Sequence, residues 1–189
     1  MALGATVYTF KIDLADSDRS VYAPLDLRVA RHPSETEDYL LTRVLAYCLE
    51  YTEGIEFSSG ISDADQPAIA VRDLTGVLTT WIDIGAPEAA RLHRASKLAR
   101  RVAVYTHKEP GALLAKLQLE RIHRAESLEI YAVDRDWLNA LSSKLARRME
   151  FSLTIADRNL YLSLGEETLS GVVRRLHLTG AQPQPSSAR

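Results

Sequence analysis

The chain has 189 residues, 46% of them hydrophobic, and its 23 basic residues are nearly balanced by 25 acidic ones. This length favours one domain with one continuous core, because two domains would each have a thin core. The net charge of −2 excludes the overall basic excess of high-affinity, nonspecific nucleic-acid binders, but a local basic groove is compatible with it.

The first residues of the chain predict an antiparallel hairpin. Apolar and polar residues alternate over residues 5–14 and again over residues 25–29, with the polar turn 15–19 between them. Alternation with a period of two is typical of strands that bury one face. We therefore expect two paired strands at the start of the sheet.

A helix is expected to follow this hairpin. Ser34 is the expected N-cap, and Glu37, three residues later, completes a capping box. The apolar residues behind it predict a buried stripe, formed by Leu41, Val44, Leu45 and Cys48. Cys48 is the only cysteine, so no intramolecular disulfide can form, and its apolar neighbours predict a buried thiol in a reducing compartment.

The middle of the chain predicts three strands. A short strand over 55–57 precedes a polar loop over 58–67, and two further strands over 68–71 and 77–84 flank the turn 72–76. The loop has the polar composition of segments that carry functional sites.

The second half of the chain alternates between helix and strand patterns. Pro87 suits a first helical position, and the periodicity from there to Leu98 predicts a helix that leads into a strand over 102–105. A strand, helix and strand in this order imply a parallel crossover. Further along we expect a helix over 113–122, a strand over 128–133, a helix over 136–147, and two strands over 151–155 and 160–164.

These patterns predict a mixed α/β protein with one domain over residues 1–178. Residues 179–189 are rich in proline, glutamine and serine, which is typical of a flexible tail. No segment has the roughly 18 consecutive apolar residues that a membrane span needs, and the N-terminus shows no long apolar run. We therefore expect a cytoplasmic protein that does not contact membranes.

Several segments together resemble the YaeQ family. They are the opening hairpin, residues 30–36 (ARHPSET), residues 73–76 (DLTG) and residues 81–85 (WIDIG). The string RHPSET is specific when it occurs with the other blocks in this order, and the similarity extends from residue 2 to about residue 170.

This resemblance implies a variant of the PD-(D/E)XK restriction-endonuclease-like fold. Its αβββαβ core would carry an added N-terminal β-hairpin and additional C-terminal strands. The elements expected between residues 34 and 105 follow the same order. In such nucleases, acidic residues on adjacent strands hold a divalent cation, which activates water and neutralises phosphate charge.

The chain departs from the nuclease pattern at two positions. Residues 67–68 are Pro-Ala where the pattern has Pro-Asp, and residues 83–85 are Asp-Ile-Gly where it has an acid, any residue and lysine. Asp83 and, from the preceding loop, Asp65 are therefore the candidate ligands of Mg²⁺ or Mn²⁺. Glu35 is a candidate auxiliary acid, because this fold often sends an acid from its first helix to the site.

A cation for phosphate binding is expected from the helix after Pro87. Arg91 and Arg94 are three residues apart and share a face, which Lys97 extends. Arginine binds phosphate bidentately but stays protonated, so it stabilises charge without acting as a general base. A metal-bound hydroxide would then be the attacking group.

Each candidate also has a structural interpretation. Asp65 can cap a turn, Glu35 suits the positive end of a helix dipole, and the two arginines can pair with Glu88 or Asp83. Two hypotheses about function therefore stay open. One is a divalent-metal phosphodiesterase that acts on nucleic acid, and the other is a noncatalytic binding or regulatory protein on a degenerate nuclease scaffold.

Overall fold

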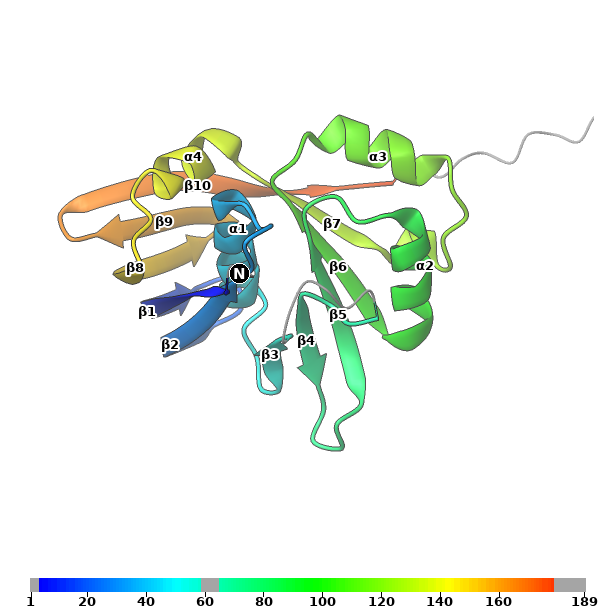
Figure 1. The fold of residues 1–189 in the computed structure, drawn as a ribbon, viewed down its shortest axis with the longest axis horizontal. Helices are drawn as coiled ribbons and strands as arrows, with labels where there is room; N and C mark the ends of the chain where they lie inside the picture. Colours follow the sequence, from blue (N-terminus) through cyan, green and yellow to red (C-terminus); the bar gives the residue numbers. More distant parts are fainter. Residues whose placement is uncertain (1–3, 59–64, 179–189) are drawn as a thin grey trace, which may run out of the picture.

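The computed structural model describes residues 4–58 and 65–178, so the predicted tail over 179–189 lies outside the described residues. Figure 1 shows a large mixed sheet with helices on its faces. The strands in chain order are β1 (Thr6–Asp16), β2 (Val21–Arg31), β3 (Ile55–Phe57), β4 (Ile69–Arg72), β5 (Leu78–Ile84), β6 (Arg101–Thr106), β7 (Glu129–Val133), β8 (Arg148–Ala156), β9 (Asn159–Leu164) and β10 (Glu167–Leu176). The helices are α1 (Glu37–Leu49), α2 (Ala89–Leu98), α3 (Pro110–Gln118) and α4 (Arg135–Ser142), with a short 3-10 turn, η1 (Ala125–Ser127).

All ten strands of the described residues form one sheet, in the order β2-β1-β8-β9-β10-β7-β6-β5-β4-β3. The strand β10 joins its two halves. Its residues 167–172 pair with β9, and residues 173–176 pair with β7. The two halves turn toward each other at this strand, with α1 between them (Figure 1).

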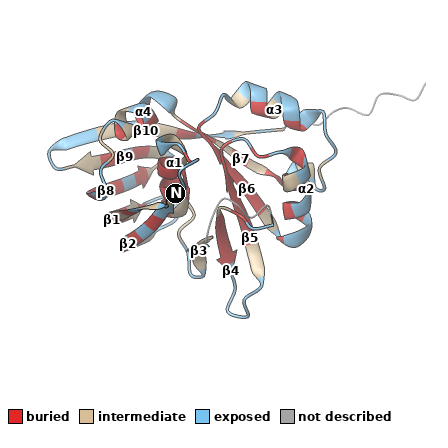
Figure 2. Cartoon of the chain, in the orientation of Figure 1, coloured by how far each residue is buried: buried red, intermediate tan, exposed pale blue. Residues whose placement is uncertain are grey.

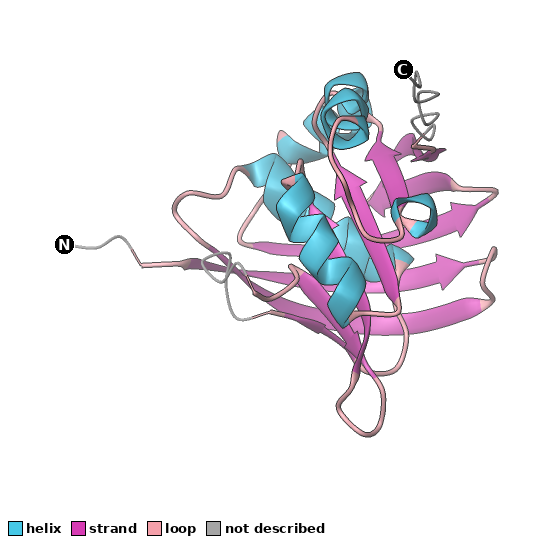
Figure 3. Ribbon diagram, turned by 90° about the vertical axis from the view of Figure 1, so that its right-hand side faces the viewer, coloured by secondary structure: helices cyan, strands magenta, loops and turns pink. Residues whose placement is uncertain are grey.

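The helix α1 is enclosed by both halves of the sheet. Buried residues occur all round it rather than on one stripe, including the predicted Val44 and Cys48. Together with side chains from both sheet halves and α4, they form the larger hydrophobic core. A smaller core lies on the opposite face of β5, β6 and β7, under α2 and α3. Figure 2 shows the buried strand faces and Figure 3 the side of the sheet that α2 and α3 cover.

The start of α1 differs from the expected one. Thr36, not Ser34, is the N-cap, because its hydroxyl accepts a hydrogen bond from the Tyr39 backbone N–H at 3.2 Å. The Ser34 hydroxyl instead lies 2.6 Å from Nδ1 of His32, and Glu37 forms an ion pair with Arg31 at 3.5 Å. The predicted capping box was therefore wrong, since the turn before the helix uses these side chains internally.

The expected order of helix, three strands, helix and strand is confirmed over α1, β3, β4, β5, α2 and β6. The strands β5 and β6 are parallel, so the crossover through α2 is confirmed too. Side chains of β5 alternate between the two cores: Ile82 and Ile84 face α1, whereas Trp81 belongs to the core under α2. Asp83 falls on the α2 side by the same alternation.

Several boundaries in the rest of the chain were misplaced, and one strand was missed. The helix α3 starts three residues before the expected position, because Glu109 caps it and Pro110 occupies its first position. The helix α4 ends at Ser142 rather than at residue 147, and β8 begins at Arg148. The strand β10 was not predicted, although it closes the sheet.

Gly171 allows α4 to lie close to β10. A Cβ atom on this glycine would come within 2.4 Å of the Trp137 ring atom Cγ. The same tryptophan is buried and donates a hydrogen bond from Nε1 to the Leu169 carbonyl at 3.1 Å. The contact therefore fixes α4 against the strand that joins the sheet halves.

No helix of the described residues has the length and apolar character that crossing a membrane would require.

We predict that Gly171→Ala lowers the free energy of unfolding by about 1–3 kcal/mol, because the Trp137 ring cannot retreat without moving α4 off β10. Urea unfolding at equilibrium measures the change. Gly111→Ala in α3 is the matched control, since its new Cβ would mainly meet the flexible Glu109 carboxylate. Equal stability of Gly171→Ala and the unsubstituted protein would contradict this account.

Candidate functional site

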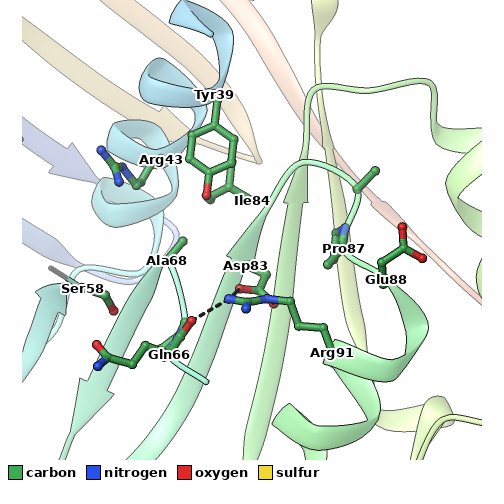
Figure 4. A pocket seen from close by; sticks show the side chains of 12 residues that line it. Tyr39, Arg43, Ser58, Gln66, Ala68, Asp83, Ile84, Pro87, Glu88 and Arg91 are labelled. Atoms are coloured by element: carbon green, nitrogen blue, oxygen red, sulfur yellow. Dashed lines mark hydrogen bonds and ion pairs between the residues drawn. The ribbon is translucent and has the colours of Figure 1, made fainter. Parts of the chain in front are cut away.

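A pocket of about 310 Å³ opens between the first half of α1, the end of β5 and the start of α2. Figure 4 shows the residues that line it, which come from these three elements and from the segment before β4, with Arg91 beside Asp83 and Gln66. The lining residues that matter for charge are Arg43, Asp83, Glu88 and Arg91. The pocket thus contains Asp83 and Arg91, two of the candidate site residues from the sequence analysis.

Asp83 and Arg91 form a two-pronged ion pair in this pocket. The Arg91 atoms Nε and Nη2 each lie 2.8 Å from a different carboxylate oxygen of Asp83. The Asp83 side chain is only 3% exposed and that of Arg91 25%. Nη2 of Arg91 also donates to the Gln66 carbonyl at 2.6 Å, and the guanidinium lies 5.2 Å from the centre of the Trp81 ring. The guanidinium therefore occupies the position between a buried carboxylate and a backbone carbonyl.

A second ion pair lies near it at the surface. Arg94, one turn after Arg91, contacts the carboxylate of Asp65. Both side chains are well exposed, at 51% and 72%, and neither lines the pocket. Lys97 is exposed on the following turn of α2. The predicted residues of β5, α2 and the loop thus lie on one side of the molecule, but in two separate pairs.

Glu35 does not line the pocket itself but contacts Arg43, which does. It lies in the turn before α1 and is buried, with Oε1 3.0 Å from Nη1 of Arg43. Burial raises the pKa of the Glu35 carboxyl, and the Arg43 charge opposes this rise. Arg43 also donates to the Ala30 carbonyl at 2.7 Å. Glu35 is therefore the counterion that holds Arg43 at the pocket wall.

Sequence reasoning missed two pocket residues of α1, Tyr39 and Arg43. A signal for Arg43 was present, because a charge within an apolar helical run must be paired when it is buried. Tyr39 carried no such signal. Burial raises the pKa of the Tyr39 hydroxyl to about 12, so it stays protonated and can act as a hydrogen-bond donor in the pocket.

His107 is a third missed residue, and its ring packs against Tyr39. Its buried ring lies edge-on to Tyr39, with 6.3 Å between ring centres. Within residues 4–58 and 65–178, neither ring nitrogen has a hydrogen-bond partner. Burial, reinforced by the Lys108 charge, lowers the pKa of His107 to about 4. The ring is therefore neutral at physiological pH.

The N-terminus of α2 opens onto the same pocket. The turn before it passes through Gly85, whose φ is +85°, and through Pro87 and Glu88, which line the pocket. The N-cap residue Glu88 makes no capping hydrogen bond with its side chain and instead binds Lys116 at 2.7 Å. Backbone N–H groups at a helix start carry partial positive charge and favour anions.

The described side chains do not fit a resident Mg²⁺ or Mn²⁺ ion. No three histidine, cysteine or acidic side chains among them come together as a metal centre would require. Both oxygens of Asp83 contact Arg91, and Asp65 contacts Arg94. Mg²⁺ takes six oxygen ligands, usually one or two free carboxylates completed by water and phosphate oxygens. A divalent cation at Asp83 would have to displace a guanidinium.

Comparison with protein families and known proteins gives one consistent result. The model of the YaeQ protein family matches residues 1–172. The uncharacterized YaeQ protein of Escherichia coli K12 is 30% identical over 187 residues, covering 98% of this chain and all of that protein. The Salmonella typhi protein of the same name is 31% identical over the same length.

Two solved structures have the same fold. The crystal structure of the YaeQ protein from Pseudomonas syringae has a TM-score of 0.83 and 29% sequence identity, covering 91% of this chain and 96% of that one. The YaeQ protein from Xanthomonas axonopodis pv. citri gives a TM-score of 0.82 at 29% identity, covering 92% and 98%. The names of these proteins state no activity, so function has to be argued from the site.

We predict that Asp83→Asn lowers the free energy of unfolding by about 2–3 kcal/mol, because it removes the negative charge that both hydrogen bonds of a largely buried guanidinium contact. The double variant Asp83→Asn/Arg91→Met should recover part of this loss, and urea unfolding of the unsubstituted protein, Asp83→Asn, Arg91→Met and the double variant would show this as a coupling energy. Asp65→Asn at the exposed pair is the control and should change stability by less than about 1 kcal/mol. Additive effects at Asp83 and Arg91 would rule out a stabilising pair.

We also predict that acid weakens the fold through His107. Its pKa is lowered from 6.5 to about 4. Between pH 6.5 and pH 4, His107 is therefore protonated in the unfolded chain but neutral in the folded protein. The stabilisation is complete above pH 6.5 and is lost as the pH falls toward 4, by about 3 kcal/mol for this group. His107→Leu should flatten this part of the stability profile, whereas His177→Gln at an exposed histidine should not. A profile that His107→Leu leaves unchanged would contradict the assignment.

Proposed function

The chain belongs to the YaeQ family, and we propose that it binds the phosphodiester backbone of a nucleic acid, or a related phosphorylated ligand, without hydrolysing it. It is then a noncatalytic binding or regulatory protein that retains a degenerate PD-(D/E)XK nuclease scaffold. One observation carries the noncatalytic part. Arg91 contacts both oxygens of Asp83 at 2.8 Å, in the place where nuclease chemistry needs a divalent cation.

The phosphate part of the proposal rests on what surrounds this pair. Pro87 and Glu88, just before α2, line the pocket, so the positive end of the helix lies at its edge, and Arg43 and Arg91 add guanidinium groups to the lining. Arginine recognises phosphate oxygens through paired hydrogen bonds. Arg94 and Lys97, exposed on successive turns of α2, lie where the next phosphates of a strand would pass.

The same groups do not supply the chemistry of hydrolysis. An arginine stays protonated at any physiological pH, so Arg91 cannot activate a water molecule. Tyr39 keeps its proton as well, because burial raises its pKa to about 12. The Asp83 carboxylate is held by two hydrogen bonds from Arg91. The pocket therefore offers guanidinium donors to an anion, while each of its carboxylates is already paired, Asp83 with Arg91 and Glu88 with Lys116.

A divalent-metal phosphodiesterase is the second candidate, and one observation favours it. A cationic group already lies between the Asp83 carboxylate and the Gln66 carbonyl, and Asp65 precedes Gln66 in the chain. Mg²⁺ or Mn²⁺ could take this position if Arg91 moved aside, with Asp83 and Asp65 as ligands and Glu35 as an auxiliary acid. The order of elements from α1 to β6 agrees with a nuclease core.

We predict that labelled single- and double-stranded DNA and RNA bind the purified protein in fluorescence anisotropy at low salt, with affinity that falls as salt rises. Arg91→Ala should weaken binding by about tenfold or more, because it removes a preorganised contact to phosphate. Arg174→Ala, on the exposed side of β10, is the matched control and should bind normally. Circular dichroism checks that each variant is folded.

Incubation of the same pools with Mn²⁺ distinguishes the two candidates. Under the proposed function, neither the unsubstituted protein nor Asp83→Ala cleaves any pool. Cleavage that Asp83→Ala abolishes would replace the proposal with the metal phosphodiesterase. Absence of binding to all four nucleic acids, or binding that Arg91→Ala leaves intact, would refute a nucleic-acid site at this pocket.

A further inference from the structure

A second pocket, of about 220 Å³, lies at the seam between the two halves of the sheet. It shares no lining residue with the first pocket. Its walls come from the turn after β1, the end of α1, the strands β6, β7, β8 and β10, and the turn after β8. None of its lining residues is among the candidate site residues proposed from the sequence.

One wall of this pocket is a closed network of charges. Arg101 donates two hydrogen bonds to Glu50, at 2.6 and 2.9 Å, and also binds Glu129. The hydroxyls of Tyr105 and Tyr131 donate to the same two carboxylates, and the tyrosine rings stack with centres 4.9 Å apart. These groups satisfy one another, so this wall is rigid and needs no ligand.

Another lining residue, Arg158, carries a charge that is not satisfied in this way. Arg158 lines the pocket, and its guanidinium makes no hydrogen bond or ion pair within the described part of the chain. Beside it, Leu49, Ile155 and Val173 give the pocket an apolar surface. The pocket therefore combines one exposed, uncommitted cation with an apolar surface, while Asp16 is paired with Arg19 and Glu50 with Arg101.

The backbone at Arg158 is unusual for such a residue. Asp157 and Arg158 form a two-residue hairpin turn and have φ values of +51° and +61°. Turns of this kind favour Asn-Gly, because a side chain at positive φ is strained. The Asp18 carboxylate accepts hydrogen bonds from both turn N–H groups, at 2.7 and 2.9 Å. Asp18, in the turn between β1 and β2, thus stabilises a backbone conformation at residue 158 that glycine adopts more easily than arginine.

From this arrangement we infer that the second pocket binds a small organic anion. A carboxylate or phosphate head would pair with Arg158, and an apolar body would pack against Leu49, Ile155 and Val173. The volume is below the roughly 300 Å³ at which sites for drug-sized ligands begin, so the body is about one ring in size. The positive φ of Arg158 then has a functional explanation, because this backbone conformation places the Arg158 guanidinium at the pocket.

The test uses benzoate and phenyl phosphate as one-ring anions and inorganic phosphate as an anion without an apolar body. The full-length protein, labelled with ¹⁵N, is titrated with each compound and followed by NMR. Both ring compounds should shift backbone signals around Ile155 and Val173, and inorganic phosphate should bind at least about tenfold more weakly. Shifts confined to the first pocket, around Tyr39 and Asp83, would overturn the inference.

Two glycine variants of the turn separate the role of the side chain from that of the backbone. Arg158→Gly should lose about tenfold or more in affinity for both ring compounds, while its thermal unfolding midpoint is at least as high as that of the unsubstituted protein. Asp157→Gly relieves strain at the adjacent position but keeps the arginine, so it should bind normally. Unchanged affinity in Arg158→Gly, equal losses in both variants, or no binding to the unsubstituted protein would each refute the site.

Discussion

The pairing of β10 with two different neighbours is the constraint on which the rest of the structure depends. Because its first residues pair with β9 and its last with β7, both halves of the sheet stay in one hydrogen-bonded sheet and enclose α1. The enclosed helix then contributes to both pockets. Tyr39 and Arg43 near its start line the first, and Leu49 and Glu50 at its end line the second. The position of each site thus follows from the same enclosure.

The enclosed helix α1 carries the buried charge of Arg43, which requires a counterion. Glu35, in the segment ARHPSET that precedes the helix, provides it. Residues 32–36 connect β2 to α1, and Nε of Arg31, the last residue of β2, donates to the Glu35 carbonyl at 3.0 Å. The Ser34 hydroxyl and the His32 ring bind each other, and the Glu35 side chain pairs with Arg43 inside the protein. The string RHPSET is therefore structural in its direct contacts. Its effect on the pocket is to fix the position of Arg43.

The same logic of burial applies to Asp83, with a different consequence for function. A carboxylate at the end of β5 faces the α2 side and has to be neutralised, and Arg91 does this with two hydrogen bonds. In a metal-dependent nuclease, a divalent cation would have this task and would also carry the attacking water. A guanidinium neutralises the charge and presents donors to a phosphate, but it brings no water. The choice of cation at this carboxylate therefore separates a binding site from a catalytic one.

Local pattern was enough to predict the opening hairpin, the burial of Cys48, the parallel crossover, and the placement of Asp83 near a strand end with Arg91 and Arg94 on one helix face. These features depend on alternation, helical periodicity and turn residues within a few positions of each other, which the sequence contains directly. The strand β10, the ion pair of Arg43 and the burial of His107 depend instead on segments that are distant in the chain. Which cation meets Asp83, and which arginine is left without a partner in the second pocket, were decided by the tertiary structure, because charges pair only with the groups that folding brings within a few ångströms.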